Sequence, residues 1–331
     1  MEGDSKVVLL NNTSEDPNWG CQATSSELKL LLRRKFPKLE TVNISFSNSF
    51  KERLSGHLKM WSLYFNLHYS LKYLAPLFKF YFVNISLNKE VYKEISESNA
   101  VVLNGEGTIH VFNRAVAKWM HYIIVAKLVF GKKAVIVNHT YQIDEPNVIK
   151  ITKFAYSLAD KVFVREPNSI LELDKLNIKL EKVRVVPDAA FMKKPSRNLN
   201  NINQGKYFCV CGNVKVNNEQ LQNLIELIEF VYKKYDFIPV FMSADKSDEK
   251  LFALIKCRVK ETIHFENNNE VQAAIDKIDG AELFITGRFH PFVFSLSTNT
   301  PTVTYKSNTF KIEGVKKMLD IDEVSTSIEL S

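Results

Sequence analysis

The chain has 331 residues, enough for two hydrophobic cores of roughly 150 residues each. Its hydrophobic fraction of 45% and charged fraction of 24% are ordinary for globular proteins and exclude an intrinsically disordered chain. The net charge of +7 predicts anionic partners, a class that includes phosphorylated small molecules, nucleic acid and acidic membrane surfaces.

The cysteines and the amino terminus indicate a cytoplasmic protein without a structural metal. The four cysteines lack paired C-x-x-C spacing, so we expect neither a zinc site nor a disulfide framework. The first ten residues place two acids before a short apolar run, which is not the pattern of a secretory signal. The nearest candidate for a membrane-spanning helix is interrupted by Lys59, Lys72 and Lys79.

Short β-rich runs alternate with amphipathic segments along the chain. In the first half, strands are predicted at residues 7–10, 100–103, 134–137, 162–164 and 184–186. In the second half, strands are predicted at residues 207–211, 237–242, 283–286 and 302–305, with a helix at 217–234. This alternation predicts an α/β fold with two doubly wound, Rossmann-like parallel sheets.

A polar stretch rich in Asn, with Pro and Gly, separates the two halves. We therefore predict an amino-terminal domain over residues 1–192, a linker over 193–206 and a carboxy-terminal domain over 207–331. In doubly wound sheets, ligands bind outside the carboxyl ends of the strands. The chemically capable residues do follow the predicted strands, as at Asn18 and Gly20 after the first of them.

The segment after the predicted strand 283–286 is the most specific of these. Arg288 offers a planar fork for carboxylate or phosphate, and His290 can supply a proton near neutral pH. Pro291 is placed as a first helical residue, and N–H groups at a helix start favour an anion. The alternative is that Arg288 ties loops together and His290 caps or packs.

Three further strand ends carry residues with two interpretations each. Arg165 is either a ligand for an anion or the partner of Glu166 in a salt bridge. His139 is either a ligand-binding residue or a histidine bonded to a backbone carbonyl. Asp188 is assigned a structural or supporting role.

The turn at residues 105–108 contains Gly105, Glu106, Gly107 and Thr108. Its two glycines permit positive φ and bring backbone close to a ligand, although glycine turns also simply close strands. No Gly-Lys-Ser/Thr follows, so this is not a nucleotide-binding P-loop. Glu106 is either a base or sugar-hydroxyl acceptor, or a solvated turn acid.

Residues 57–85 combine aromatic side chains with lysines and contain no acid. Such a composition suits a membrane interface, a sugar-stacking surface or single-stranded nucleic acid. A packed pair of helices is the competing interpretation.

Several of these segments resemble the polysaccharide pyruvyl transferase family, over residues 7–315. Residues 286–290 (Thr-Gly-Arg-Phe-His) resemble the family's Arg-Leu-His segment, with Phe289 in place of leucine. Residues 18–20 resemble its Asn-x-Gly turn, residues 162–166 its strand ending in arginine, and residues 187–188 its Pro-Asp turn. Residues 105–108 differ from the run of glycines found in many relatives, which leaves a changed acceptor or donor substrate open.

The resemblance implies a GT-B-like fold with two domains facing a central cleft, the first on the acceptor side and the second on the donor side. It also implies transfer of a pyruvyl group from phosphoenolpyruvate to a sugar as a ketal, without cofactor or metal. By this resemblance His290 would be the catalytic acid, whereas Glu106 is a candidate catalytic residue from its own turn, as a base or an acceptor for a sugar hydroxyl. The donor substrate would contact Arg165, Arg288, His139 and Phe289; the acceptor or its loop would involve Asn18, Gly20, Gly105, Gly107 and Thr108; Asp188 would support the site.

The expected partners are an anionic small-molecule donor and a saccharide acceptor, with a lipid-linked acceptor and a peripheral membrane contact through residues 57–85 left open. No nucleic acid is expected. One alternative is a GT-B glycosyltransferase using a nucleotide sugar, with the arginines on its diphosphate. A second is a nonenzymatic basic protein that binds sugar or nucleic acid.

Overall fold

The computed structural model describes residues 5–44, 75–86, 88–110, 113–142, 145–196, 205–213, 216–244, 246–267 and 270–321. The chain divides into two compact units. Unit 1 comprises residues 1–12, 28–165 and 169–186, and unit 2 comprises residues 13–27, 166–168 and 187–331. Most of the predicted linker, residues 197–204, and residues 57–74 of the aromatic segment lie outside the described residues.

The units differ from the predicted domains because part of the first half of the chain packs with the second half. Trp19 and Ala23 are buried in the same hydrophobic cluster as Cys209 and Cys211. Burial of a tryptophan side chain removes a large apolar area from water, so the segment that carries it belongs to unit 2. The predicted boundary at residue 192 therefore does not coincide with the structural division.

Unit 1 is built on a parallel sheet whose strand order is β2-β1-β3-β5-β6-β7, with β4 paired to β5. The strands are β1 (Val7–Leu10), β2 (Leu39–Val42), β3 (Ala100–Asn104), β4 (Thr108–Ile109), β5 (Lys133–Tyr141), β6 (Lys161–Val164) and β7 (Val183–Val185). From β1 the chain pairs β2 on one side and β3 on the other, so the strand order reverses between β1 and β3. Ligands of doubly wound sheets bind at such a point.

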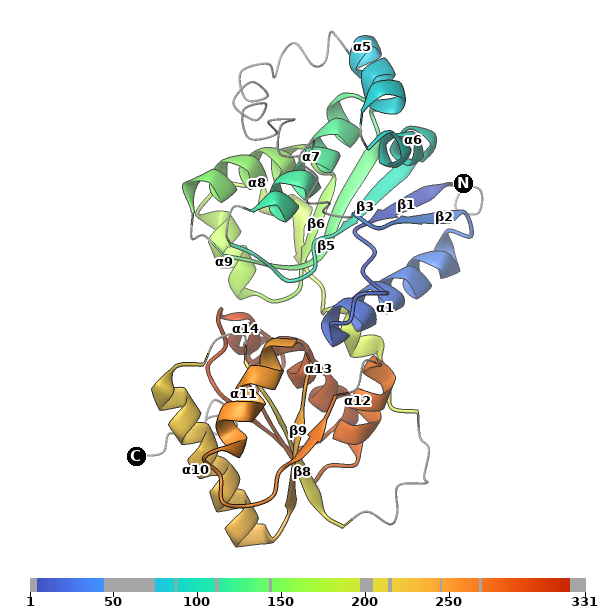
Figure 1. Ribbon diagram of the computed structural model, residues 1–331. Helices are drawn as coiled ribbons and strands as arrows, with labels where there is room; N and C mark the ends of the chain where they lie inside the picture. Colours follow the sequence, from blue (N-terminus) through green and yellow to red (C-terminus); the bar gives the residue numbers. More distant parts are fainter. Residues whose placement is uncertain are drawn as a thin grey trace. The chain divides into compact units, whose positions relative to one another are not determined.

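Helices cover the sheet of unit 1 (Figure 1). They are α5 (Ala75–Phe80), the π-helix η1 (Tyr81–Ile85), α6 (Lys89–Glu97), α7 (Arg114–Leu128), α8 (Pro146–Leu158), α9 (Asn168–Asp174) and η2 (Leu180–Lys182). The helix α1 (Trp19–Lys35) contributes residues to both units. Apolar side chains of β1, β3 and β5 form one core with α6 to α8.

Unit 2 contains a second parallel sheet with the order β10-β9-β8-β11-β12. Its strands are β8 (Tyr207–Cys211), β9 (Ile238–Met242), β10 (His264–Glu266), β11 (Leu283–Thr286) and β12 (Thr302–Thr304). Its helices are η3 (Ala189–Met192), α10 (Asn218–Tyr235), α11 (Lys246–Lys256), α12 (Val271–Asp279), α13 (Phe289–Thr298) and α14 (Lys311–Met318). Here the order reverses between β8 and β11.

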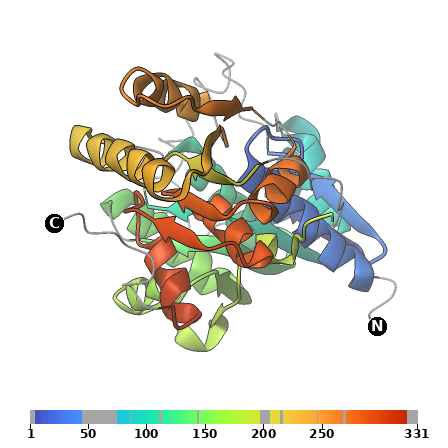
Figure 2. The ribbon, with the colours of Figure 1, turned by 90° about the horizontal axis from the view of Figure 1, so that it is seen from below.

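The central strand β8 shows why this sequence forms a doubly covered sheet. All five of its residues are buried. Tyr207, Cys209 and Cys211 pack with α12 to α14, whereas Phe208 and Val210 pack with α10 and α11. Figure 2 shows helices on both faces of this sheet. A continuous apolar run is the expected sequence of a parallel strand buried on both sides.

The predicted strands are confirmed within one or two residues, except β5, and the described segments contain three further strands. β2, β4 and β10 were not predicted, because each is only two to four residues long and β2 and β10 are partly exposed. β5 continues to Tyr141, four residues beyond its predicted end. Among the described residues, none of the helices has the length and apolar character needed to cross a bilayer.

Candidate functional site

The predicted site residues fall into two groups, one in each unit. Unit 2 holds Asn18, Gly20, Asp188, Arg288, Phe289 and His290, and unit 1 holds Gly105, Glu106, Gly107, Thr108, His139 and Arg165. Arg288, Phe289 and His290 follow β11 of the unit 2 sheet, and residues 105–107 follow β3 of the unit 1 sheet, as the strand-end rule predicts. Asn18, Gly20 and Asp188 follow β1 and β7, which are strands of the unit 1 sheet, although these three residues belong to unit 2.

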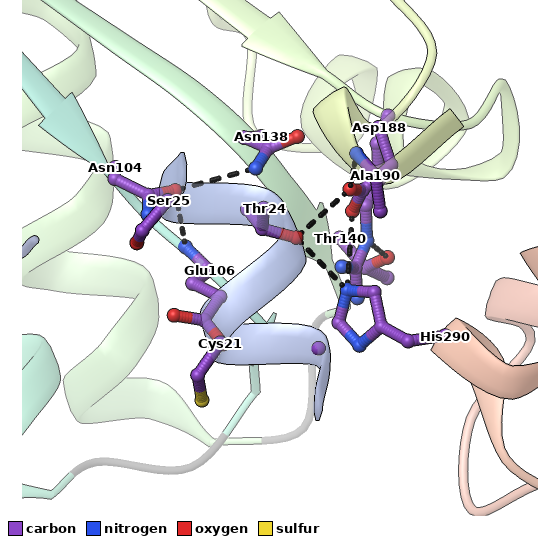
Figure 3. A network of polar contacts seen from close by, with 12 residues as sticks. Cys21, Thr24, Ser25, Asn104, Glu106, Asn138, Thr140, Asp188, Ala190 and His290 are labelled. Carbon is purple, nitrogen blue, oxygen red and sulfur yellow. Dashed lines mark hydrogen bonds and ion pairs between the residues drawn. The ribbon is translucent and has the colours of Figure 1, made fainter. Parts of the chain in front are cut away.

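His290 lies in the first turn of α13, immediately after β11 (Figure 3). Its Nε2 atom is 3.2 Å from Thr24 Oγ1 and 3.5 Å from Asp188 Oδ2. Its side chain is 14% exposed, whereas the Asp188 side chain is fully buried. The ring is thus held by two polar groups on one nitrogen and keeps partial access to solvent.

The hydrogen bonds around Asp188 define the state of this ring. Thr24 Oγ1 donates to Asp188 Oδ1 at 3.0 Å, and the Ala190 N–H donates to the same oxygen at 2.9 Å. The single hydroxyl proton of Thr24 is therefore used, so its oxygen is left to accept from Nε2–H of His290. This arrangement favours the tautomer with the proton on Nε2.

The Asn-Trp-Gly turn makes room for this histidine. Asn18 Oδ1 accepts from the N–H groups of Gly20 and Cys21, at 2.9 and 3.3 Å, which caps the start of α1. A Cβ atom at position 20 would lie 1.9 Å from Nδ1 of His290. Gly20 was predicted to lie in a loop; it lies in the first turn of α1, and its missing side chain is required by the ring.

Arg288 is the N-cap residue of α13 and forms a buried ion pair. Its Nε and Nη2 atoms donate to Oδ1 of Asp248, at 3.0 and 2.8 Å, while Oδ2 accepts from the Ala244 N–H at 3.0 Å. Arg288 is 9% exposed and Asp248 is fully buried. The pair lies beside Gly212, at the reversal of strand order in unit 2. The loop-tying interpretation is observed, and donor binding by Arg288 stays a prediction.

Two details of α13 correct the predictions. Phe289 is 3% exposed and belongs to the hydrophobic core of unit 2, which favours a packing role over the predicted contact with the donor substrate. Pro291 is the third residue of the helix, which begins at Phe289. The chain turns into the helix earlier than predicted because Arg288 already has extended backbone angles and its N–H donates to Thr286 Oγ1.

In unit 1, His139 is a buried residue of β5 and does not follow the strand as predicted. Asn138 adopts a φ of 67°, and the register against β6 shifts between Ile136 and His139, which lets the strand continue. His139 Nε2 is 2.7 Å from Tyr156 Oη. A Cβ atom on Gly105 would lie 3.0 Å from that of His139, so the glycine permits this close approach.

Burial determines the charge of His139. It lowers the pKa of the ring from 6.5 to about 3; the carbonyl of Val137 opposes the shift, and the charge of Arg165 adds to it. The ring is therefore neutral near pH 7. A fully buried, neutral histidine packs within the core at the end of the strand. This environment favours a structural role over direct contact with an anionic substrate.

Arg165 is 1% exposed and is tied to the same strand. Its backbone N–H donates to the His139 carbonyl at 3.1 Å, and its Nε donates to Thr140 Oγ1 at 3.0 Å. These two bonds fix the guanidinium at the end of β6. Its position is that of a strand-end arginine, and its role in binding a substrate stays a prediction.

Three asparagines link adjacent strands in unit 1, and Figure 3 shows two of them, Asn104 and Asn138. The Asn11 side chain donates to the Asn104 carbonyl at 2.8 Å, and the Asn138 side chain donates to Asn104 Oδ1 at 3.3 Å. The Glu106 N–H also reaches Asn104 Oδ1, at 3.4 Å. Asn104 thereby shapes the turn that carries the half-buried Glu106, at the reversal of strand order.

The glycine turn after β3 is shorter than predicted, because Thr108 is already the first residue of β4. Gly107 has a φ of 93°, a conformation that L side chains rarely adopt, and no atom lies within 4 Å of where its Cβ would be. The glycine is therefore required by the backbone angle and not by crowding.

Sequence reasoning missed three residues of these groups: Thr24, Tyr156 and Asp248. Asp248 follows β9, so the strand-end rule applied to that strand would have found it. Thr24 and Tyr156 lie within ordinary amphipathic helices, where no local pattern distinguishes them from other buried polar residues.

The cysteines and acids give no metal centre in the described part of the chain, where no group of three or more His, Cys, Asp or Glu side chains is arranged to hold an ion. Burial raises the pKa of the Cys209 and Cys211 thiols, so both remain protonated. They are core residues of β8 and not nucleophiles.

The fold and the site define a transferase of the GT-B-like α/β class with two parallel sheets. The chain belongs to the polysaccharide pyruvyl transferase family, whose profile matches residues 18–308. This match confirms the resemblance and sets aside the nonenzymatic alternative. No curated protein matches the sequence.

Solved structures with a similar fold include UDP-GlcNAc 2-epimerases. That of Methanocaldococcus jannaschii in complex with UDP-GlcNAc and UDP is 16% identical, with a TM-score of 0.56 over 96% of this chain and 87% of that one. The Neisseria meningitidis enzyme bound to UDP-GlcNAc is 12% identical, with a TM-score of 0.55 over 95% and 85%. The S. aureus MnaA structure with UDP is 12% identical, with a TM-score of 0.55 over 96% of this chain and 82% of that one. At these identities the likeness shows the fold alone.

The contact of Gly20 with His290 leads to a first prediction. Gly20→Ala should force the ring away from Thr24 and Asp188, and turnover should fall by about 10²- to 10⁴-fold, the usual contribution of a positioned acid or base. The measurement is steady-state turnover together with thermal unfolding, with Cys21→Ala as the control at the next position. Wild-type turnover in a folded Gly20→Ala protein would contradict the assignment.

The lowered pKa of His139 leads to a second. Between the unfolded pKa of 6.5 and the folded pKa of about 3, the unfolded chain binds a proton that the folded chain does not. The free energy of unfolding should therefore fall with decreasing pH, with this residue's share approaching about 1.4 kcal/mol per pH unit. Urea unfolding at several pH values should show a smaller slope in His139→Gln, whereas Tyr156→Phe should keep the wild-type slope. Equal slopes in wild type and His139→Gln would refute the neutral assignment.

Proposed function

We propose that the protein transfers a pyruvyl group from phosphoenolpyruvate to two hydroxyls of a sugar, forming a ketal in polysaccharide biosynthesis. The observation that carries the proposal is the geometry of His290 in a chain of this family. Its ring is oriented by a buried carboxylate and a hydroxyl, and it keeps partial exposure at the carboxyl edge of a parallel sheet. A histidine held in this way is suited to proton transfer.

The proposed reaction begins with a proton. Protonated His290 gives its proton to the methylene carbon of phosphoenolpyruvate, which leaves an oxocarbenium-like centre at the adjacent carbon. The orientation of the ring is set by Thr24 and Asp188 at Nε2 and by the backbone of Gly20, against which Nδ1 packs. Asp188 stabilises the imidazolium before the transfer and fixes its orientation.

Two sugar hydroxyls then attack the same carbon in turn. The first addition forms a C–O bond and releases one proton, which restores the imidazolium of His290. The bond from carbon to the phosphate oxygen breaks, and the second hydroxyl closes the ketal while its proton leaves with inorganic phosphate. Glu106, a carboxylate on a half-buried turn of unit 1, is proposed to accept a hydrogen bond from an acceptor hydroxyl, and takes up no proton in the balance of the reaction.

Arg165 and Arg288 are the proposed ligands of the donor's carboxylate and phosphate, by the family resemblance of residues 162–166 and 286–290. Both are nearly buried and held by hydrogen bonds, so their orientation precedes binding. Preorganised charge of this kind commonly supplies several kcal/mol of transition-state stabilisation. The proposal uses no metal or cofactor, and it retains the predicted saccharide acceptor and cytoplasmic location.

The second candidate is a glycosyltransferase that uses a nucleotide sugar. It is favoured by the fold shared with proteins whose structures contain UDP or UDP-GlcNAc. The two candidates predict different ligands and different products, phosphate in one case and a nucleotide in the other.

The identity of the donor substrate is therefore the third prediction. Phosphoenolpyruvate at about 100 times its Kd should raise the unfolding free energy by about 2.7 kcal/mol, because a ligand that binds only the folded state stabilises it. We expect a thermal shift with phosphoenolpyruvate and none with UDP-GlcNAc or other nucleotide sugars. With a saccharide acceptor, one inorganic phosphate should be released per ketal formed. A shift and nucleotide release with a nucleotide sugar alone would reject pyruvyl transfer.

The role of the histidine is the fourth. His290→Gln should lower kcat by about 10²- to 10⁴-fold while the Kd for phosphoenolpyruvate, measured calorimetrically, stays within about threefold of wild type. Thr24→Val removes the bonds of the hydroxyl to both Asp188 and His290, and it should lower kcat by at least about tenfold without an equal change in KM. Thr24→Ser, which keeps the hydroxyl, should restore turnover. Equal kcat values for Thr24→Val and Thr24→Ser would exclude a positioning role for the hydroxyl.

Arg288→Ala is a poorer test of donor binding than the histidine variant. Its removal leaves the buried Asp248 carboxylate without the guanidinium, which typically destabilises a protein by about 3–5 kcal/mol. The double change Arg288→Met with Asp248→Asn removes both charges and separates a loss of binding from a loss of folding.

A further inference from the structure

The segment formed by α5 and η1 exposes an apolar face that the catalytic proposal does not use. Leu77 is 69% exposed, Phe80 62% and Ile85 61%, and Tyr81 is 43% exposed. We call these four residues the α5–η1 face. Their spacing of three, one and four residues places them along one side of the helical segment. In Figure 1, α5 lies at the edge of unit 1, near α6.

The opposite side of the same segment is anchored in the core of unit 1. Phe82 is 3% exposed, and its ring centroid lies 4.6 Å from that of Tyr92 and 5.8 Å from that of His121. Phe78 and Val83 pack against the same core. The exposed side chains therefore belong to a segment that is already docked, and their exposure is not the result of a helix detached from its unit.

Single exposed apolar residues are normal, but a contiguous group is typical of an interaction surface. Among the described residues with large exposed apolar side chains, Leu77, Phe80 and Ile85 have the three highest exposed fractions. Three such side chains within nine residues form an apolar surface of the kind that binds a partner.

The charges around the face indicate the kind of partner. The described residues 75–86 contain one lysine, Lys79, and no acid, and the neighbouring helix α6 begins with the exposed pair Lys89 and Glu90. Lys79 lies between Leu77 and Phe80 in the sequence and is exposed at the flank of the face. It is also near Lys132, whose pKa is lowered by burial and further by the charge of Lys79. The face thus combines apolar side chains with positive charge. We therefore expect a partner that has both an apolar region and negative charge.

Three partners meet part of this description. A second copy of the chain would bring Lys79 against Lys79 and therefore like charge against like charge, which is unfavourable at an apolar interface. Single-stranded nucleic acid is anionic, but its bases stack on aromatic rings, and Leu77 and Ile85 offer none. A bilayer with anionic headgroups takes aliphatic and aromatic side chains at its acyl boundary and lysines at its headgroups.

We propose that the α5–η1 face binds the surface of an anionic lipid bilayer, with Leu77, Phe80 and Ile85 entering the headgroup and acyl boundary and Lys79 contacting lipid phosphate. This inference is independent of the donor substrate. It places the enzyme at the membrane surface through residues far in sequence from the His290 group.

The experiment uses the full-length protein and vesicles. Wild type should co-sediment with phosphatidylcholine vesicles that contain about one third phosphatidylglycerol, and much less with phosphatidylcholine alone. Binding should weaken as salt is raised, because screening reduces the attraction of Lys79. The variant Leu77→Ser/Phe80→Ser/Ile85→Ser should bind at least about tenfold more weakly, since its apolar insertion is lost.

The matched control is Leu171→Ser/Phe230→Ser/Leu254→Ser, which changes side chains that are 55%, 49% and 50% exposed on other helices. It should bind vesicles as wild type does. Circular dichroism melting of both triple variants separates lost binding from lost folding. Lys79→Glu, a single exposed change, should reduce binding to anionic vesicles selectively and keeps the test decisive if the first triple variant does not fold.

Three outcomes would overturn the proposal. The first is absence of binding to anionic vesicles by wild type. The second is equal binding by the face variant and the control. The third is loss of a dimer, or of oligonucleotide binding, in the face variant without any vesicle binding by wild type; this result would assign the face to a second copy or to nucleic acid.

Discussion

The contact between the His290 ring and the bare backbone of Gly20 is the constraint on which the unit 2 group depends. The His290 ring fits against position 20 only because that residue has no side chain. In this position of the ring, Nε2 lies close to Thr24 and Asp188. The group therefore joins the start of α1, the turn before η3 and the start of α13. None of these segments orients the histidine alone, so the proton-transfer geometry is a product of tertiary folding.

Two buried carboxylates hold the start of α13. Asp248 binds Arg288 and the Ala244 N–H, while Asp188 binds Thr24, the Ala190 N–H and His290. A buried carboxylate is costly unless its hydrogen bonds are satisfied, and each of these has several partners. As a result, the guanidinium and the imidazole are oriented by protein groups before any substrate binds. Such preorganisation is what an electrostatically stabilised transition state requires, because the groups need not reorganise during the reaction.

The sequence allowed most of the fold to be predicted, because strands such as β8 and β11 are buried on both faces and appear as continuous apolar runs. Short, partly exposed strands such as β10 lack that signal. The strand-end rule located His290, Asp188 and Arg165, but not Thr24, whose partner His290 is 266 residues away along the chain. The burial of the two histidines could not be predicted from the sequence either. Nothing in the local sequence distinguishes His139, which is fully buried, from His290, which is not.

That difference in environment assigns different roles to the two histidines. His139 lies in the core against Tyr156, and its lowered pKa keeps the ring neutral beside the charge of Arg165. A proton on His139 would be both desolvated and repelled, so this ring cannot serve as an acid near neutral pH. His290 instead faces a carboxylate, which attracts the charge of a protonated ring, and it remains accessible. Pairs of titratable groups in opposed environments commonly mark a division of chemical labour. Burial and the charge of Arg165 thus keep the His139 ring neutral in unit 1, whereas the His290 ring in unit 2 lies beside a buried carboxylate and is partly exposed.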